Sequence, residues 1–259
     1  EHILKLESPQ PAATARVRET SPLVGRDDAW AKLQEAWQKA TRSQPQLLIV
    51  SGEAGIGKTR LVEEFAERLR RQATATAVAH CYSAGGNLAL APVQEWLRDP
   101  VLRKSLQGLE PIWTSEIARL LPELLVEQPD LTPPVLPNEA WQRSRLFDAL
   151  SHAFAHNGEP LLLVLDDVQW CDSETVEWIH HLLRSSHAQR LLIIATLRQE
   201  AFDAQSTLAS LINQLRRDGL TSQIEIHRLD ASQTAALASN LIGRQLSAAQ
   251  SARLFAESE

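Results

Sequence analysis

A glycine-rich segment that ends in lysine and threonine carries the clearest chemistry in this sequence. It reads Gly52-Glu53-Ala54-Gly55-Ile56-Gly57-Lys58-Thr59. Glycine allows backbone conformations in which successive N–H groups point at one phosphate. With this spacing the ammonium of Lys58 reaches the β- and γ-phosphate oxygens, and the hydroxyl of Thr59 binds Mg²⁺. We therefore predict that all eight residues bind nucleotide and that Lys58 also contributes to catalysis.

The residues on both sides of this segment predict the elements that a phosphate-binding loop requires. An apolar run at residues 47–51 indicates a buried strand, and residues 58–71 place five apolar side chains on one helical face. The start of that helix adds the positive end of its dipole. A glycine-rich turn without this function is the alternative, and the flanking elements argue against it. Arg60 is included among the predicted nucleotide contacts, with a solvated or ion-paired helix residue as its alternative.

Two adjacent carboxylates follow a second apolar run. Residues 161–165 indicate another buried strand, and Asp166 and Asp167 come directly after it. The carboxyl edge of a parallel sheet faces the crevice where ligands bind. We predict that Asp166 binds magnesium together with Thr59, and that Asp167 orients the attacking water or takes its proton. The alternative is that one of the pair caps the helix opening at Ser173 or forms an ion pair.

An arginine follows a third apolar run, at residues 191–196. Arg198 would emerge at the same sheet edge as Asp166, where its guanidinium could contact the γ-phosphate, so we include it among the catalytic residues. A surface arginine paired with Glu200 is the alternative. Thr196, at the tip of the strand, is a further candidate for positioning water.

Apolar strands alternate with helices along most of the chain. Strands are predicted at residues 46–51, 76–82, 161–165, 191–196 and 222–227. Helices are predicted at residues 27–41, 58–71, 139–156, 173–183 and 206–217, with shorter pieces across 91–125 that prolines interrupt. Strands that are apolar throughout and separated by helices form a parallel sheet covered on both faces. We therefore predict an α/β fold, a P-loop nucleotide hydrolase three-layer sandwich with a five-stranded parallel sheet.

Composition narrows the class of partner. The chain has 26 basic and 32 acidic residues and a net charge of −6, which argues against direct nucleic-acid binding because such surfaces are usually basic. No apolar stretch approaches the ~20 residues of a membrane helix, so no membrane contact is expected. Cys81 and Cys171 lie far apart in a sequence with no signal peptide, so we expect no structural disulfide and a cytoplasmic location.

A longer acidic motif gives a resemblance to a known family. The segment Leu163-Val164-Leu165-Asp166-Asp167-Val168-Gln169-Trp170-Cys171-Asp172 looks like the extended acidic motif of the STAND branch of P-loop ATPases. It resembles in particular the origin-recognition-like ATPase module of bacterial LuxR- and SARP-type transcriptional regulators. The resemblance covers about residue 22 to the end. Leu197 stands where the family usually has tyrosine, a departure that leaves the expected role of Arg198 intact.

The resemblance implies a ligand and a base-binding box. The segment Pro22-Leu23-Val24-Gly25-Arg26-Asp27 is similar to the box in which the family packs adenine, so Leu23, Val24, Gly25 and Arg26 are expected to contact the base and ribose. The implied cofactors are ATP or ADP with Mg²⁺. The Gly-x-Pro signature of the family's helical domain would come just after the last residue of this sequence.

The resemblance also divides the chain. Residues 1–21 are expected to be a linker from an upstream domain, and residues 22–229 the P-loop ATPase domain. Helical patterns at 232–241 and 247–257 place the beginning of a truncated helical lid domain at residues 230–259. We interpret the sequence as part of a longer polypeptide.

The function implied is an ATP-binding, slowly hydrolysing switch module of a multidomain signal-transduction protein, most of all a transcriptional regulator. Its expected partners are other domains of the same polypeptide and, depending on nucleotide, further copies of itself. Three alternatives stay open: a non-hydrolysing assembly scaffold, a module of a sensor kinase or nucleotide cyclase, and a DNA-remodelling ATPase related to origin-recognition loaders. The last would need basic surfaces that this acidic chain does not suggest.

Overall fold

Five strands form one parallel sheet in the computed structural model. The strands are β1 (Gln46–Gly52), β2 (Ala75–His80), β3 (Leu161–Asp166), β4 (Leu191–Arg198) and β5 (Thr221–Glu225). Their order across the sheet is β2-β3-β4-β1-β5, and every neighbouring pair is parallel. The predicted five-stranded parallel sheet is confirmed. The residues described are 23–83, 88–132, 139–155, 158–185, 190–203 and 205–258.

The strands at the centre of the sheet are buried on both faces. In β1 every residue after Gln46 is buried, and in β4 only Arg198 is partly exposed. A continuous apolar run is the pattern of a strand covered by helices on both sides. In β5, at the edge of the sheet, only Ile224 is buried. The register places Gly52 of β1 beside Arg198 of β4, at the carboxyl edge of the sheet.

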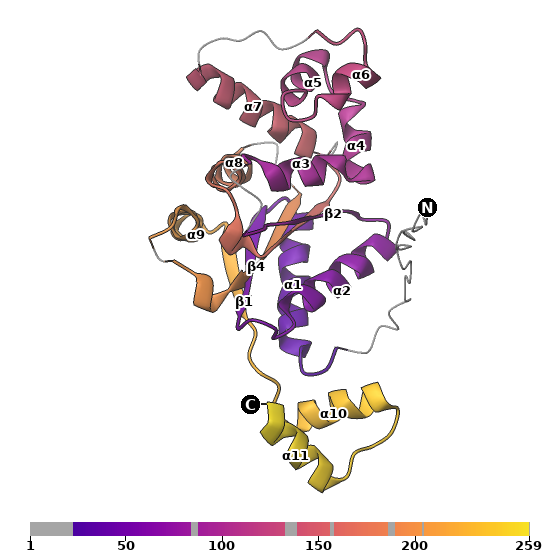
Figure 1. Cartoon of the computed structure of the whole chain (residues 1–259). Coiled ribbons are helices and arrows are strands. Elements are labelled where there is room, and N and C mark those ends of the chain that lie inside the picture. The colour runs from indigo at the N-terminus through magenta and orange to yellow at the C-terminus, as the bar shows by residue number, and fades with distance from the viewer. Residues whose placement is uncertain are drawn as a thin grey trace, which may run out of the picture. The chain divides into compact units, whose positions relative to one another are not determined.

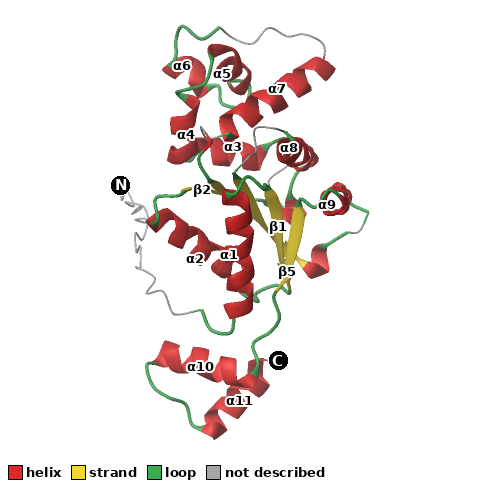
Figure 2. Cartoon of the chain, turned by 180° about the vertical axis from the view of Figure 1, so that it is seen from behind, coloured by secondary structure: helices red, strands yellow, loops and turns green. Residues whose placement is uncertain are grey.

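Helices cover both faces of the sheet (Figures 1 and 2). Helices α1 (Asp27–Thr41) and α2 (Lys58–Arg71) lie on one face, and α8 (Ser173–Arg184) and α9 (Thr207–Arg217) lie on the other. The five apolar residues predicted to share one face of α2 are all buried. This three-layer arrangement follows from the apolar stripe of each helix, which must pack against the sheet.

A group of helices separates β2 from β3 in the sequence (Figure 1). It comprises α3 (Ala91–Arg98), α4 (Pro100–Leu106), α5 (Pro111–Ile117), α6 (Glu123–Glu127) and α7 (Glu139–Phe154). The interruptions predicted at three prolines are confirmed, since Pro100 and Pro111 open their helices and Pro122 precedes α6. Trp96 joins this group to the sheet: its Nε1 donates to the carbonyl of Val164 at 2.9 Å.

The described part of the chain divides into two compact units, one within residues 26–228 and the other formed by residues 23–25 with 229–258. In the second unit, α10 (Ala231–Ile242) packs against α11 (Ala248–Ser258). A capping box opens α10, because Asp230 accepts from the backbone of Gln233 and the side chain of Gln233 accepts from the backbone of Asp230.

Some predicted element ends differ from the structure. Asp172 rather than Ser173 caps α8: its Oδ1 accepts from the backbone N–H of Thr175 at 2.8 Å, and from that of Leu90 at 3.0 Å. A carboxylate one residue earlier can serve two backbone donors, which the sequence did not reveal. Strand β4 continues two residues beyond its predicted end, to Arg198.

Smaller differences concern other strands and helices. Strand β2 ends at His80, two residues before its predicted end, and β5 covers 221–225 rather than 222–227. His156, the predicted end of a helix, lies outside the described residues, as do Pro133, Pro134 and Pro137. Within the described residues, no helix combines the length and the apolar character needed to cross a membrane.

Candidate nucleotide-binding site

The phosphate loop is an open turn between β1 and α2. Gly55 and Gly57 have φ angles of +77° and +96°, a region that residues with a side chain rarely adopt. A Cβ added at either position would meet nothing within 4 Å, so the conformation rather than crowding requires glycine. Helix α2 begins at Lys58, and its first N–H groups therefore lie next to the loop. An open space edged by backbone N–H groups and a helix N-terminus fits a phosphate group.

Lys58 lies across the start of the loop. Its side chain is buried, with 6% of the residue exposed, and its Nζ donates to the carbonyls of Gly52 at 2.9 Å and Glu53 at 2.7 Å. Burial lowers the pKa of Lys58, and the charges of Glu200 and Asp167 partly oppose that shift. The ammonium is thus held inside the loop by neutral carbonyls, which a charged phosphate can replace as a stronger partner.

Three oxygen-bearing side chains meet beside the loop. Thr59 Oγ1 donates to Asp166 at 2.9 Å from Oδ1, and Thr196 Oγ1 donates to the same Oδ1 at 2.5 Å. They come from α2, β3 and β4, so the sheet register brings the two predicted magnesium residues together. A hydroxyl and one carboxylate suit Mg²⁺, which keeps several of its waters and takes few protein ligands. The described residues contain no group of three or more His, Cys, Asp or Glu side chains that could enclose a metal ion.

Asp167 and Arg198 form an ion pair at the same sheet edge. Arg198 Nε donates to Asp167 Oδ1 at 3.0 Å, and Nη2 donates to Oδ2 at 2.6 Å. Asp167 has the left-handed conformation, φ 57° and ψ 48°, and its carboxylate bonds to Arg198, whereas that of Asp166 bonds to Thr59 and Thr196. The ion-pair partner of Arg198 is therefore Asp167, whereas the sequence suggested Glu200 as the alternative partner.

The ion pair changes the acidity of both groups. Burial raises the pKa of Asp167, but hydrogen bonds from Arg198 and Gln169, with the charges of Arg198 and Lys58, outweigh it and hold the pKa below its ordinary value. The hydrogen bond to Asp167, together with its charge, raises the pKa of Arg198. Asp167 is therefore a carboxylate at neutral pH, the form that could orient water or accept a proton.

Gln169 is a site residue for which the sequence predicted no role. Its Nε2 donates to Asp167 Oδ1 at 3.0 Å, and its Oε1 accepts from the backbone N–H of Arg198 at 3.1 Å. The backbone N–H of Asp167 donates to Thr196 Oγ1 at 2.8 Å. These bonds tie the end of β3 to the end of β4. The only feature of the sequence that could have indicated this role was the position of Gln169 within the acidic motif.

The other residues predicted to contact the nucleotide lie in different parts of the structure. Leu23, Val24 and Gly25 are partly exposed and belong to the smaller unit, whereas the phosphate loop belongs to the larger one. Arg26 belongs to the larger unit and bonds to the phosphate loop itself. Arg60 is exposed in the first turn of α2.

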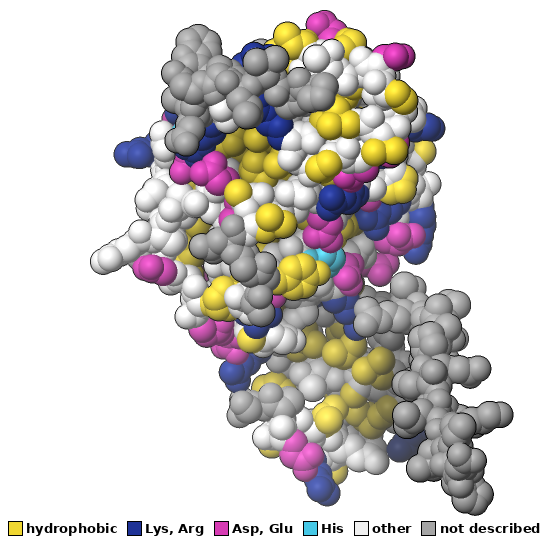
Figure 3. All heavy atoms as spheres, turned by 45° about the horizontal axis from the view of Figure 1, so that its top comes forward, with side chains coloured by type: hydrophobic (Ala, Val, Ile, Leu, Met, Phe, Trp, Pro, Cys, Tyr) yellow, Lys and Arg dark blue, Asp and Glu magenta, His cyan; other side chains and the backbone are white. Residues whose placement is uncertain are grey.

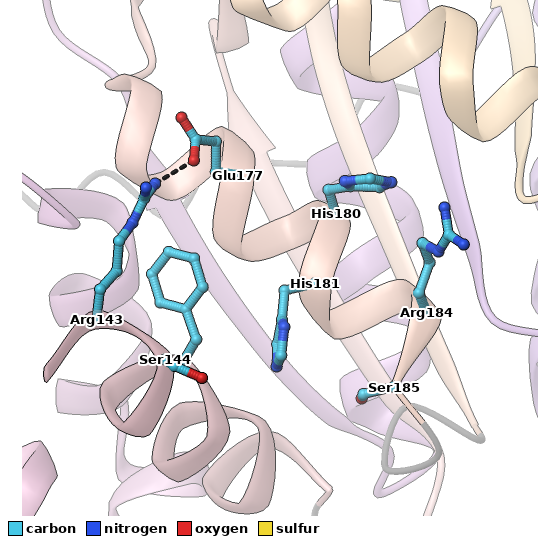
Figure 4. A pocket seen from close by; sticks show the side chains of 8 residues that line it. Arg143, Ser144, Glu177, His180, His181, Arg184 and Ser185 are labelled. Atoms are coloured by element: carbon cyan, nitrogen blue, oxygen red, sulfur yellow. Dashed lines mark hydrogen bonds and ion pairs between the residues drawn. The ribbon is translucent and has the colours of Figure 1, made fainter. Parts of the chain in front are cut away.

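A separate hollow lies between α7 and α8 (Figure 4). It has a volume of about 560 Å³, and its lining includes Arg143, Glu177, His180, His181 and Arg184. Three of its basic side chains lie next to acids: Arg143 faces Glu177 (Figure 4), His181 lies 3.2 Å from Asp148, and Arg184 lies 3.3 Å from Asp218. Burial and the charge of Arg184 lower the pKa of His180. With both arginines already paired with acids, this hollow offers no strong site for phosphate.

A phosphate loop after β1 and an acid at the end of β3, with β4 between these two parallel strands, define a P-loop nucleotide hydrolase fold. The comparison with protein families agrees: residues 22–194 match the AAA ATPase domain, and the chain belongs to this family. No curated protein sequence gave a significant match.

Solved structures share the fold at low sequence identity. Cdc6p from Pyrobaculum aerophilum is 14% identical, with 87% of this chain and 51% of that chain covered and a TM-score of 0.50. DnaA from Aquifex aeolicus, bound to AMPPCP, is 15% identical, with 89% and 56% covered and a TM-score of 0.47. The chain thus spans about half the length of these proteins. At this identity the likeness concerns the fold alone.

Proposed function

We propose that this chain is an ATP-binding and slowly hydrolysing switch module. The observation that carries the proposal is the meeting of Thr59 and Asp166 beside the glycine loop, with the Asp167–Arg198 pair at the same sheet edge. The residues that we propose for nucleotide binding, metal binding and hydrolysis thus come from three separate segments of the chain. Such convergence is what phosphoryl transfer to water requires, because its catalysis is mainly positioning and charge stabilisation.

The loop and its neighbours would hold the nucleotide. Residues 52–59 would hold the phosphates, with Lys58 exchanging its two carbonyl partners for phosphate oxygens. Thr59 and Asp166 would hold Mg²⁺, which when bound neutralises charge on the phosphates. Leu23, Val24 and Gly25 are proposed to contact adenine, and Arg60 the phosphates.

Hydrolysis would depend on Asp167 and Arg198 separating. Asp167 would orient the attacking water or accept its proton, but both its oxygens now accept hydrogen bonds from Arg198. A γ-phosphate offers Arg198 a competing anion. The need to break an ion pair before each turnover supports slow hydrolysis, ATP to ADP and phosphate, and a response that depends on the γ-phosphate.

The wider role follows from the resemblance of the acidic motif to STAND ATPases. We place the module in a multidomain cytoplasmic signal-transduction protein, most of all a transcriptional regulator, acting through other domains of its polypeptide and nucleotide-dependent self-association. Direct nucleic-acid binding by this chain is not part of the proposal. On the face seen in Figure 3, acidic and basic side chains lie side by side, and the net charge of the chain is −6.

A binding and turnover experiment tests the proposal. The chain is titrated with fluorescent ATP and ADP with and without Mg²⁺, and phosphate release is followed at saturating ATP. We expect saturable binding of both nucleotides and turnover that requires Mg²⁺. Absence of saturable nucleotide binding would refute the proposed function. Binding without phosphate release would instead favour the non-hydrolysing scaffold, which the occupied oxygens of Asp167 also suit.

A further inference from the structure

Arg26 lies outside the glycine motif but forms a hydrogen bond to the phosphate loop. Its Nη2 donates to the carbonyl of Ile56, in the middle of the loop, at 2.9 Å. Its Nη1 donates to the carbonyl of His227, just after β5, at 2.7 Å. Burial lowers the pKa of Arg26, but an arginine stays protonated at neutral pH. A single planar guanidinium therefore links two backbone segments that are remote in sequence.

A second arginine links the same two segments. Arg228 Nε donates to Glu53 Oε2 at 2.8 Å, and its Nη2 lies 2.8 Å from the same oxygen. Glu53 opens the loop immediately after Gly52, and Arg228 follows His227. The two arginines thus hold the loop at two points, one near its start and one near its middle.

The backbones of the two segments also touch at Gly52. The N–H of Ile226 donates to the carbonyl of Ser51 at 2.8 Å, which extends the pairing of β1 with β5. A Cβ added to Gly52 would lie 2.6 Å from the carbonyl oxygen of Ile226. The first residue of the loop is therefore pressed against the segment that leaves β5, and only glycine fits there.

We propose that Arg26 is a positioning residue for the phosphate loop, acting with the Glu53–Arg228 ion pair. Together they fix the loop against residues 226–228, so that the loop keeps its open form before nucleotide arrives. The inference rests on the proposed function only for its effect on nucleotide affinity. It assigns Arg26 to the loop rather than to the base and ribose, because both terminal nitrogens already bond to carbonyl oxygens.

A fixed loop has a direct consequence for binding. A loop that must be ordered during binding loses conformational entropy, and this loss weakens the affinity. Arg26 and the Glu53–Arg228 ion pair, together called the clamp below, order the loop before nucleotide binds, so this entropy is not lost during binding. Hydrogen bonds from a charged donor are also stronger than neutral ones, so two of them from one side chain suffice to hold a short loop.

The first experiment needs no nucleotide. Amide hydrogen exchange at residues 53–57 is compared between the parent chain and Arg26→Ala, Arg26→Lys and Arg184→Ala. Lysine keeps the charge but cannot span two carbonyls. We expect exchange in the loop to rise about tenfold in both Arg26 variants, since two charge-assisted hydrogen bonds are lost. The control, an exposed arginine in the Arg184–Asp218 pair, should leave the loop unchanged.

Unchanged loop exchange in the Arg26 variants would overturn the proposal. Thermal unfolding checks that each variant is folded. If Arg26→Ala does not fold, Arg26→Lys and Glu53→Gln carry the comparison, with a smaller rise in loop exchange expected for Glu53→Gln because its pair is half exposed.

The second experiment measures nucleotide affinity of the same variants. We expect Kd to rise about tenfold for both Arg26→Ala and Arg26→Lys. If Arg26→Lys binds as tightly as the parent while Arg26→Ala does not, Arg26 acts on the nucleotide through its charge and the clamp is wrong. If the parent binds no nucleotide, the proposed function fails, and the exchange experiment still decides the role of Arg26.

Discussion

The two halves of the candidate site are built differently. The phosphate loop, from β1 and α2, is made of backbone N–H groups and one buried lysine, of which 6% is exposed. The other half, at the ends of β3 and β4, consists of side chains, and the side chain of Arg198 is 43% exposed. The first half is already open to phosphate, whereas the second is closed on itself by an ion pair. We therefore expect nucleotide binding and the response to the γ-phosphate to be separable by mutation.

The largest effect that we expect is the loss of kcat when Asp167, in the second half of the site, is replaced. We expect Asp167→Asn to lower kcat about 10²- to 10⁴-fold, the range for loss of a general base, because an amide cannot take a proton. Nucleotide Kd should change by no more than about threefold, since the phosphate loop is intact. Steady-state phosphate release and a binding titration measure the two quantities.

A matched carboxylate outside the site provides the control for this variant. Asp148, in α7, is the ion-pair partner of His181 and is not part of the candidate site. Asp148→Asn should therefore leave kcat unchanged. If Asp167→Asn weakened binding as strongly as it lowered kcat, the two halves would not be separable.

Lys58→Ala tests the first half. The variant loses the ammonium that would contact the phosphates, so Kd for ATP and ADP should each rise about 100-fold, two charge-assisted hydrogen bonds being worth about 3 kcal/mol or more. Isothermal titration measures both constants. Lys39→Ala, which removes an exposed lysine paired with Glu35, is the control. Unchanged affinity in Lys58→Ala would show that the loop does not hold phosphate.

Arg198→Ala tests what the second half recognises. Because only ATP carries a γ-phosphate for the guanidinium, the preference for ATP over ADP should fall about tenfold, while Kd for ADP stays close to that of the parent. Arg184→Ala should change neither constant. An equal loss of affinity for both nucleotides would mean that Arg198 acts on the loop rather than on the γ-phosphate.

The smallest effect is the pH dependence of stability. The pKa of Asp167 is held below its ordinary value in the folded chain, so its ion pair stabilises the fold above the unfolded-state pKa of about 3.9. This contribution is lost as pH falls through the lower, folded-state pKa. Thermal unfolding should therefore show a constant Tm difference between the parent and Asp167→Asn near neutral pH, which shrinks below about pH 4. A difference that grows on acidification would contradict the ion pair.

Local patterns predicted much of the architecture. The apolar runs at β1, β3 and β4 were recognisable because strands buried on both faces admit almost no polar residue. Prolines fixed the start of α4 and α5, since they lack an N–H and suit the first turn. Element ends were harder, because neighbouring polar residues compete for one role: Asp172 and Ser173 could each cap α8, and a contact with Leu90 favours the aspartate.

Contacts between remote segments could not be predicted in this way. Cys81 and Cys171 lie far apart in the sequence and are free cysteines, as expected, yet the influence of Cys81 together with burial raises the pKa of Cys171. Gln169 had no predicted role, and Arg198 had two candidate partners. Each case depends on which strand ends lie side by side, and one sequence contains no record of strand order.

The sequence by itself determined that this chain has a glycine loop between a strand and a helix, and acids at the end of a second strand, because those features depend on local spacing and periodicity. The tertiary structure decided how they are used. The β3-β4-β1 order brings Thr59, Asp166 and Thr196 within hydrogen-bond distance, and the same order closes Asp167 on Arg198. The pairing of β5 with β1 likewise brings His227 and Arg228 beside the loop, where His227 accepts from Arg26 and Arg228 donates to Glu53, since hydrogen bonds form only over short distances.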